Sequence, residues 1–133
     1  MSDQQTIIDI LTRLGNTQRN SSNLTAIGND FGFEEIFSRE LIALGNKKDI
    51  LIAISTSGNS RNIINLLEEA NHLSIDFYAL TGEMGGELSL YGDRIIKVPS
   101  IETFIIQQMH ILLGHIICMN TETPYLSGKA KLL

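Results

Sequence analysis

Residues 49–60 read Asp-Ile-Leu-Ile-Ala-Ile-Ser-Thr-Ser-Gly-Asn-Ser, and this stretch decides the fold. Residues 50–54 form an unbroken apolar run, which is typical of a strand buried on both faces of a parallel sheet. The run stops at a loop of small polar residues around Gly58. Residues 61–72 then repeat apolar side chains at helical spacing. The stretch therefore predicts a strand, a small polar loop and a helix.

A loop between a buried strand and a helix N-terminus is suited to bind an anion. The first N–H groups of a helix lack partners within the helix, and the helix dipole favours negative charge there. Gly58 allows a ligand to approach the backbone closely. Four hydroxyl side chains can donate to a phosphate: Ser55, Thr56, Ser57 and Ser60. The simpler alternative is that Asn59 or Ser60 only caps the helix. We interpret the loop as a phosphate site at the carboxyl end of a strand, where ligands bind in open α/β sheets.

Composition limits the class of protein. A chain of 133 residues, 43% hydrophobic, suits one globular domain. No apolar run reaches the roughly 18 residues that span a bilayer, and no secretory signal is visible, so we expect no membrane association and a cytoplasmic location. A single cysteine, Cys118, fits a reducing compartment. The net charge of -5, without a large basic cluster, argues against nucleic acid as a ligand.

The rest of the chain alternates between helical and extended patterns. We expect strands over 75–80 and 94–98, helices over 4–14, 33–44 and 102–118, and a turn beginning at Asn29 and Asp30. Such alternation predicts a parallel sheet with right-handed crossovers. The helix over 33–44 is expected to bury one apolar stripe: Phe33, Ile36, Phe37, Leu41 and Leu44.

Several motifs in order resemble those of sugar isomerase (SIS) domains, and more narrowly those of the sedoheptulose 7-phosphate isomerase (phosphoheptose isomerase) family. The motifs are the serine loop at 54–60, Gly-Asn-Asp-Phe-Gly-Phe-Glu-Glu-Ile-Phe-Ser-Arg at 28–39, Ala-Leu-Thr-Gly at 79–82, Gly-Gly-Glu-Leu at 85–88, Val-Pro-Ser at 98–100, and the helix over 107–115. The similarity divides the chain into an N-terminal helix and loop (1–22), an SIS domain (23–119) and a loosely ordered tail (120–133).

The resemblance implies a fold and an activity. The expected fold is a three-layer α-β-α, flavodoxin-like parallel sheet, shortened at its N-terminus. The expected reaction is aldose–ketose isomerisation of sedoheptulose 7-phosphate to a heptose 7-phosphate, which leads to heptose and lipopolysaccharide precursors. Such a reaction moves a proton between adjacent carbons and needs an acid, a base and a grip on the phosphate. Family members are tetramers with sites between subunits, so a homo-oligomer, tetramer or dimer, is expected.

The resemblance also assigns roles to residues of this sequence. It implies that the serine loop holds the phosphate and that Asn29 and Asp30 lie near the sugar. It matches His115 to the histidine of proton transfer and Gln107 to a glutamine beside it. In some members that pair contributes to a zinc site, so zinc is the one cofactor that the resemblance suggests. Gln107 and His115 are eight residues apart and share a helical face, whereas His110 lies on another. Taken without the family, His115 fits a hydrogen-bonded core histidine and Asp30 fits a turn cap.

The sequence also departs from the family pattern. A Gly-Asn-Gly-Gly-Ser loop and the helix with the glutamate base are absent, and Phe104 and Ile105 stand where an acid is expected. Loss of early strands would expose a sheet edge, which oligomerisation could cover. Another carboxylate would have to act as base, and the candidates are Glu34, Glu35 and Glu87. The alternatives to an enzyme are a sugar-phosphate-binding module, a protein-binding scaffold, and a truncated gene product.

Overall fold

The computed structural model of the protein describes the backbone of residues 21–126 and the side chains of residues 22–122. The helix expected over 4–14, residues 16–20 of the loop expected over 16–23 and the end of the tail lie outside the described residues. Residues 21–23 of that expected loop form the start of a helix instead.

Within residues 21–126, three parallel strands form one sheet in the order β1-β2-β3. Their bounds are Ile50–Ile54 for β1, Asp76–Thr81 for β2 and Ile95–Lys97 for β3. In β1 and β2, Ile50 lies opposite Asp76, and in β2 and β3, Ala79 lies opposite Ile95. The predicted parallel α/β sheet is confirmed, and its three strands fall where the apolar runs placed them.

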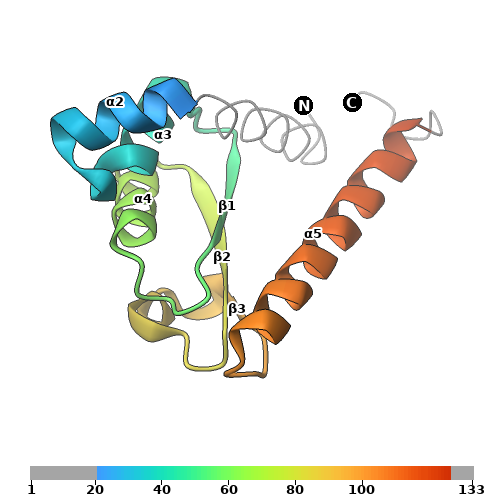
Figure 1. The fold of residues 1–133 in the computed structure, drawn as a ribbon. Coiled ribbons are helices and arrows are strands. Elements are labelled where there is room, and N and C mark those ends of the chain that lie inside the picture. The colour runs from blue at the N-terminus through green and yellow to red at the C-terminus, as the bar shows by residue number, and fades with distance from the viewer. Residues whose placement is uncertain (1–20, 127–133) are drawn as a thin grey trace.

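Helices flank this sheet on both sides (Figure 1). On one side lie α2 (Ser21–Phe31), α3 (Ile36–Leu44) and α4 (Arg61–His72), and on the other lies α5 (Thr103–Leu126), which leans away from the strands. The side toward α5 is only partly covered, because Ile54 is 52% and Tyr78 46% exposed. The described part of the chain also contains two 3-10 helices, η1 (Phe33–Glu35) and η2 (Gly86–Arg94).

The core lies between α4 and the sheet. One stripe of α4 is buried, and its apolar side chains are Ile63, Ile64, Leu66, Leu67 and Ala70. These meet Phe77 and Ala79 of β2, both fully buried, and Leu88 of η2. The helix ends at His72, and Ser74, whose φ is 56°, turns the chain so that the Ile75 N–H donates to the Ala70 carbonyl at 2.9 Å. The buried side chains of the strands and the apolar stripe of α4 therefore pack into one hydrophobic cluster.

Three local predictions were wrong. Asn29 and Asp30 belong to α2 rather than a turn, because the chain reverses at Gly32, where φ is 97°. Phe33 is 71% exposed, since residues 33–35 form a separate 3-10 turn that is out of phase with α3, and Leu44 is also exposed. Helix α5 continues past Cys118 to Leu126, although Pro124 in its last turn has no backbone N–H to donate.

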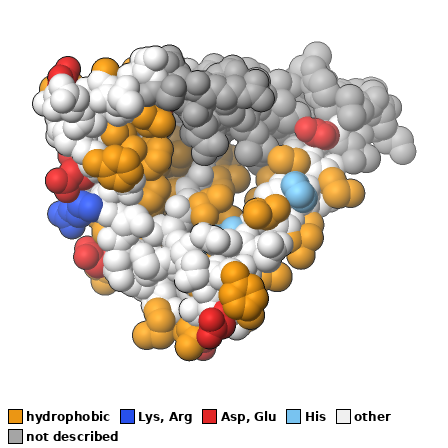
Figure 2. Space-filling view, in the orientation of Figure 1, with side chains coloured by type: hydrophobic (Ala, Val, Ile, Leu, Met, Phe, Trp, Pro, Cys, Tyr) orange, Lys and Arg blue, Asp and Glu red, His pale blue; other side chains and the backbone are white. Residues whose placement is uncertain are grey.

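Helix α5 differs from α4 in the distribution of its apolar residues. It buries Ile106 and His110 against the fold but leaves an outer row of large apolar side chains exposed (Figure 2). This α5 outer face consists of Phe104, Ile105, Met109, Ile111, Leu112 and Ile116. Within the described residues, no helix combines the length and the hydrophobicity that crossing a membrane requires.

Candidate functional site

The serine loop, residues 55–60, joins the carboxyl end of β1 to the start of α4. The buried Ser55 hydroxyl accepts the Gly58 N–H at 3.1 Å and donates to the Ser60 hydroxyl at 3.1 Å. The Ser57 hydroxyl, on the exposed rim, accepts the Asn59 N–H at 3.1 Å. Internal hydrogen bonds thus hold the loop in one shape, with Ser57 facing outward and Ser55 beneath it.

The segment that contains Gly85, Glu87 and Leu88 supports the serine loop. The Asn59 side-chain oxygen accepts the Glu87 N–H at 2.8 Å, and the Gly58 carbonyl accepts the Leu88 N–H at 3.1 Å. Gly58 has a φ of 70°, and a Cβ there would collide with the carbonyl oxygen of Gly85. The close approach of the two loops therefore requires glycine at position 58.

The helix N-terminus at the serine loop is uncapped. Ser60 occupies the N-cap position of α4 but makes no side-chain cap hydrogen bond. Asn59, the other residue of the capping alternative, directs its oxygen to Glu87 instead. Among the described residues, the N–H groups of Arg61 and Asn62 have no acceptor. The arrangement leaves donors of the first helical turn available to an anion.

Backbone hydrogen bonds fasten the carboxyl ends of all three strands together. The Gly82 N–H donates to the Thr56 carbonyl at 3.0 Å, which links the end of β2 to the serine loop. The Val98 N–H donates to the Thr81 carbonyl at 2.9 Å, and the Glu83 N–H to the Ser100 carbonyl at 3.1 Å. The loop therefore rests on a rigid edge of the sheet.

His110 links α5 to this edge, a role that sequence reasoning missed. The ring is 3% exposed, and its Nε2 lies 3.1 Å from the Thr81 carbonyl oxygen. Because a carbonyl only accepts, Nε2 carries the proton, and Nδ1 is buried without a partner. The sequence signal for the burial of His110 was its position four residues after Ile106, because residues i and i+4 share a helical face.

Asn29 and Asp30 lie exposed in the last turn of α2. The Asn29 amide donates to the Asp30 carboxylate at 3.0 Å. In the part of the chain that the structure describes, no hydrogen bond or ion pair joins either residue to the serine loop. Asn29 and Asp30 are therefore hydrogen-bonded to each other but not to the serine loop.

Gln107 and His115 are both exposed on α5, while His110 is buried, as their helical spacing predicted. His115 lies about 7.5 Å further along the helix axis than His110, away from the carboxyl edge. Neither Gln107 nor His115 makes a hydrogen bond or ion pair to the serine loop within residues 21–126. A core role for His115, the alternative from sequence, is wrong in this chain.

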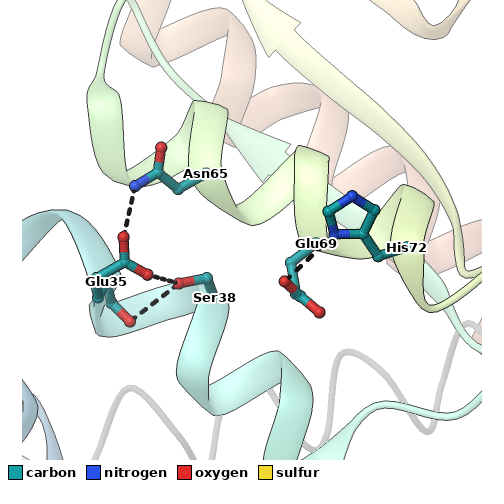
Figure 3. A network of polar contacts seen from close by, with 5 residues as sticks. All are labelled: Glu35, Ser38, Asn65, Glu69 and His72. Carbon is teal, nitrogen blue, oxygen red and sulfur yellow. Dashed lines mark hydrogen bonds and ion pairs between the residues drawn. The ribbon is translucent and has the colours of Figure 1, made fainter.

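The three carboxylates considered as bases lie in different surroundings. Glu35 is engaged between α3 and α4, where it accepts from the Ser38 hydroxyl at 2.8 Å and the Asn65 amide at 2.9 Å (Figure 3). Glu34 is exposed on η1. The backbone N–H of Glu87 donates to Asn59 of the serine loop, and its carboxylate Oε2 lies 3.8 Å from Nη1 of Arg61. Both partners of that ion pair are mostly exposed, so it stabilises the fold little.

The described residues do not fit a zinc site. No group of three or more His, Cys, Asp or Glu side chains gathers there in a way that could hold a metal ion. Gln107 and His115 supply two side chains, whereas catalytic zinc sites have three protein ligands. We therefore derive no chemical step through a metal.

A parallel sheet with a hydroxyl-rich loop at an uncapped helix N-terminus is typical of open α/β proteins that bind anions. The SIS domain family model matches residues 9–82. The chain therefore belongs to the SIS domain family. The match begins upstream of Asn23, where the sequence motifs placed the start of the domain.

The relatives narrow the likeness to phosphoheptose isomerases. The chain is 48% identical over 99 residues to the phosphoheptose isomerase of Rhodospirillum rubrum, covering 74% of this chain and 53% of that protein. It is 50% identical over 109 residues to that of Aneurinibacillus thermoaerophilus, covering 82% and 55%. The chain thus spans about half the length of the curated relatives it matches.

Solved structures show the same likeness to phosphoheptose isomerases. The phosphoheptose isomerase of Neisseria gonorrhoeae matches with a TM-score of 0.75 and 42% identity, covering 79% of this chain and 60% of that one. The enzyme from Francisella tularensis matches with a TM-score of 0.76 and 39% identity, covering 80% and 58%. The SIS-type fold expected from the sequence is confirmed.

Proposed function

We propose that the serine loop binds the phosphate of a sugar phosphate. The observation that carries this proposal is the uncapped N-terminus of α4 beside a preformed loop of four hydroxyl side chains. Arg61 and Asn62 offer N–H groups, and Ser57 offers a hydroxyl on the exposed rim. A phosphate held this way gains from the helix dipole and from charge-assisted hydrogen bonds.

We further propose that the substrate is sedoheptulose 7-phosphate and that the reaction is its isomerisation to a heptose 7-phosphate in the cytoplasm. The names of the relatives support this reaction, and residues 23–119 would form the unit that carries it. His115 would transfer the proton, with Gln107 and Asp30 orienting the open-chain sugar. Nucleic acid and membrane are no part of the proposal.

The exposed positions of Gln107 and His115 favour a site completed by a second chain. Both project from α5 in a single copy, beside the α5 outer face. Exposed apolar patches of this kind mark interaction surfaces. We propose that copies of the protein associate as dimers or tetramers through this helix, so that His115 faces a serine loop of another subunit. Zinc could then be held only by ligands shared between chains.

Of the three candidate bases, Glu87 is the one that the structure supports best. Its backbone N–H donates to Asn59 of the serine loop, and its carboxylate lies 3.8 Å from the guanidinium of Arg61 at the start of α4. Glu35 is already committed to Ser38 and Asn65. We propose that Glu87 is the carboxylate whose loss most reduces any turnover by this chain alone.

The experiment is proton NMR of sedoheptulose 7-phosphate incubated with the protein, beside the variants Ser57→Ala, His115→Ala and Glu87→Gln. Exposed Ser22 of α2 supplies a matched control, Ser22→Ala. Conversion to the aldose that is lost in His115→Ala and retained in Ser22→Ala supports the isomerase. Loss of turnover in Glu87→Gln should be about 10²–10⁴-fold if it is the base.

Two other outcomes contradict parts of the proposal. Broadening of the ligand phosphorus signal without product, abolished by Ser57→Ala, would leave a sugar-phosphate-binding module and remove the isomerase. No broadening at a millimolar ligand concentration would remove phosphate binding as well.

A further inference from the structure

Arg61, the first residue of α4, has a charge that is unusual for its position. The N-terminus of a helix carries partial positive charge, so its first turn favours acidic side chains. Helix α4 has no acidic residue in its first turn and begins with an arginine instead. The helix dipole therefore destabilises the Arg61 cation unless an anion lies nearby. Departures of this kind from a local rule are expected at functional sites.

The guanidinium of Arg61 lies beside the serine loop. In an α-helix each Cα–Cβ bond tilts toward the N-terminus, so the Arg61 side chain extends past the start of α4. Its Nη1 lies 3.8 Å from Oε2 of Glu87. Glu87 is in turn anchored to the loop, since its N–H donates to the Asn59 side-chain oxygen at 2.8 Å. The ion pair therefore stands on the rim of the loop, on the side of η2.

The ion pair between Arg61 and Glu87 is a weak one. It consists of a single long contact, and its two side chains are 61% and 59% exposed. Exposed pairs contribute little to stability, because water screens the two charges and holding two long side chains in place costs entropy. A guanidinium and a phosphate, by contrast, form short charge-assisted hydrogen bonds that are often bidentate. A phosphate at the serine loop is therefore a stronger partner for Arg61 than Glu87 is.

We propose that Arg61 exchanges Glu87 for the phosphate of the bound ligand, so that its guanidinium becomes a further phosphate-binding group of the site. This inference rests on the proposed function, because it needs a phosphate at the serine loop. It also narrows the class of ligand to phosphate and phosphate monoesters, whose charge draws the guanidinium away from the carboxylate. A neutral sugar has no such charge and leaves the ion pair in place.

A second arginine ion pair supplies a matched control. Nη2 of Arg94 lies 3.9 Å from Oδ1 of Asp76, and the two side chains are 44% and 81% exposed. Asp76 begins β2 and Arg94 directly precedes β3, so this pair lies at the amino ends of the strands. The serine loop lies at the carboxyl end of β1, so loss of the Arg94 charge should affect phosphate binding little.

The test is a titration of the ¹⁵N-labelled protein with inorganic phosphate. The amides of Gly58 and Asn62 report on the loop, and the side-chain Nε–H of Arg61 reports on the guanidinium. All three signals should shift with the same dissociation constant, whereas the Nε–H of Arg94 should stay in place. Sedoheptulose without its phosphate should move none of them.

Three variants measure the exchange directly. Arg61→Gln keeps the backbone N–H and removes only the charge, so it should weaken phosphate binding by about threefold to tenfold. Arg94→Gln should leave binding within about 1.5-fold. Glu87→Gln removes the competing carboxylate and should tighten binding by about twofold. A merely structural ion pair would give effects of the same sign for Arg61→Gln and Glu87→Gln, and circular dichroism verifies that all three variants fold.

The outcomes separate this inference from the proposed function. Saturable shifts at Gly58 and Asn62 with unchanged affinity in Arg61→Gln would overturn the inference and leave the phosphate site standing. Equal weakening in Arg61→Gln and Arg94→Gln, or weaker binding in Glu87→Gln, would also contradict the exchange. Absence of any amide shift in the unaltered protein at millimolar phosphate would remove the proposed phosphate site, and the inference with it.

Discussion

Helices α4 and α5 lie on opposite sides of the same sheet, yet they differ in how much of their apolar surface is buried. In α4, apolar residues occupy a single buried stripe, and the polar residues face outward. In α5, Ile106 and His110 are buried while the α5 outer face remains exposed. A helix that is apolar all round is typical of a position buried between two layers. The α4 side of the fold therefore buries its apolar residues within a single copy of the protein, whereas the α5 side leaves them exposed.

The largest expected difference between the two helices comes from paired leucine truncations. Leu67→Ala in α4, where Leu67 has no exposed surface, should lower the free energy of unfolding by about 2–5 kcal/mol through lost burial and a cavity. Leu112→Ala in α5, where Leu112 is 48% exposed, should change it by less than about 0.5 kcal/mol. Urea denaturation of both variants at low protein concentration measures this contrast. Equal losses would mean that α5 is buried in the single chain.

The next contrast pairs two glycines that receive the same methyl group. Gly58→Ala forces a Cβ against Gly85 at a φ of 70° and should cost about 1–3 kcal/mol of stability while disrupting the serine loop. Gly114→Ala adds a Cβ to α5 that meets nothing within 4 Å. It should stabilise the helix by about 0.5–1 kcal/mol. Thermal unfolding distinguishes the signs, and a stabilised Gly58→Ala would contradict the close contact of the two loops.

A smaller effect is expected at the C-terminal end of α4. Ser74 adopts a φ of 56°, a conformation that glycine reaches without steric cost. Ser74→Gly should therefore raise the free energy of unfolding by about 0.5 kcal/mol. The same denaturation experiment checks it, with the exposed Ser22→Ala of α2 as a neutral comparison. A loss of stability on Ser74→Gly would show that the serine hydroxyl contributes there.

The smallest effect concerns α3, which packs on α4. Burial raises the pKa of Glu40, and one of its carboxylate oxygens is buried without a partner. Because the folded-state pKa lies above the unfolded value, ionisation of Glu40 lowers stability as the pH rises through that interval. Glu40→Gln should therefore be more stable than the unaltered protein at pH 7, with the gap closing below the usual glutamate pKa of about 4.3. A gap that persists unchanged in acid would mean that ionisation is not its cause.

The sequence predicted one part of the molecule well, and the reason is physical. The run over 50–54, the hydroxyl-rich loop and the stripe of α4 each carry a strong local signal: continuous apolarity, small polar residues around a glycine, and helical spacing. All three signals point to the same strand-loop-helix unit. Agreement among them explains why β1 and α4 lie at the residues expected.

Other features depended on contacts that no local pattern shows. Asn29 and Asp30 favour turns in isolation, but α2 includes both and ends at Phe31, just before Gly32. Helical spacing predicts that Phe33 is buried, but residues 33–35 form η1, which is separate from α3, and the Phe33 side chain is exposed. The hydrogen bond from His110 to Thr81 joins residues 29 apart, and only the packing of α5 on the sheet reveals it.

The central claim is that the serine loop binds the phosphate of a sugar phosphate at the uncapped start of α4. The most direct measurement is a titration of the ¹⁵N-labelled protein with sedoheptulose 7-phosphate, followed by amide chemical shifts. Saturable shifts concentrated at Ser57, Gly58, Arg61 and Asn62, and lost in Ser57→Ala, are the predicted result. Absence of shifts at millimolar ligand, or shifts confined to residues outside the loop and the first turn of α4, would contradict the claim.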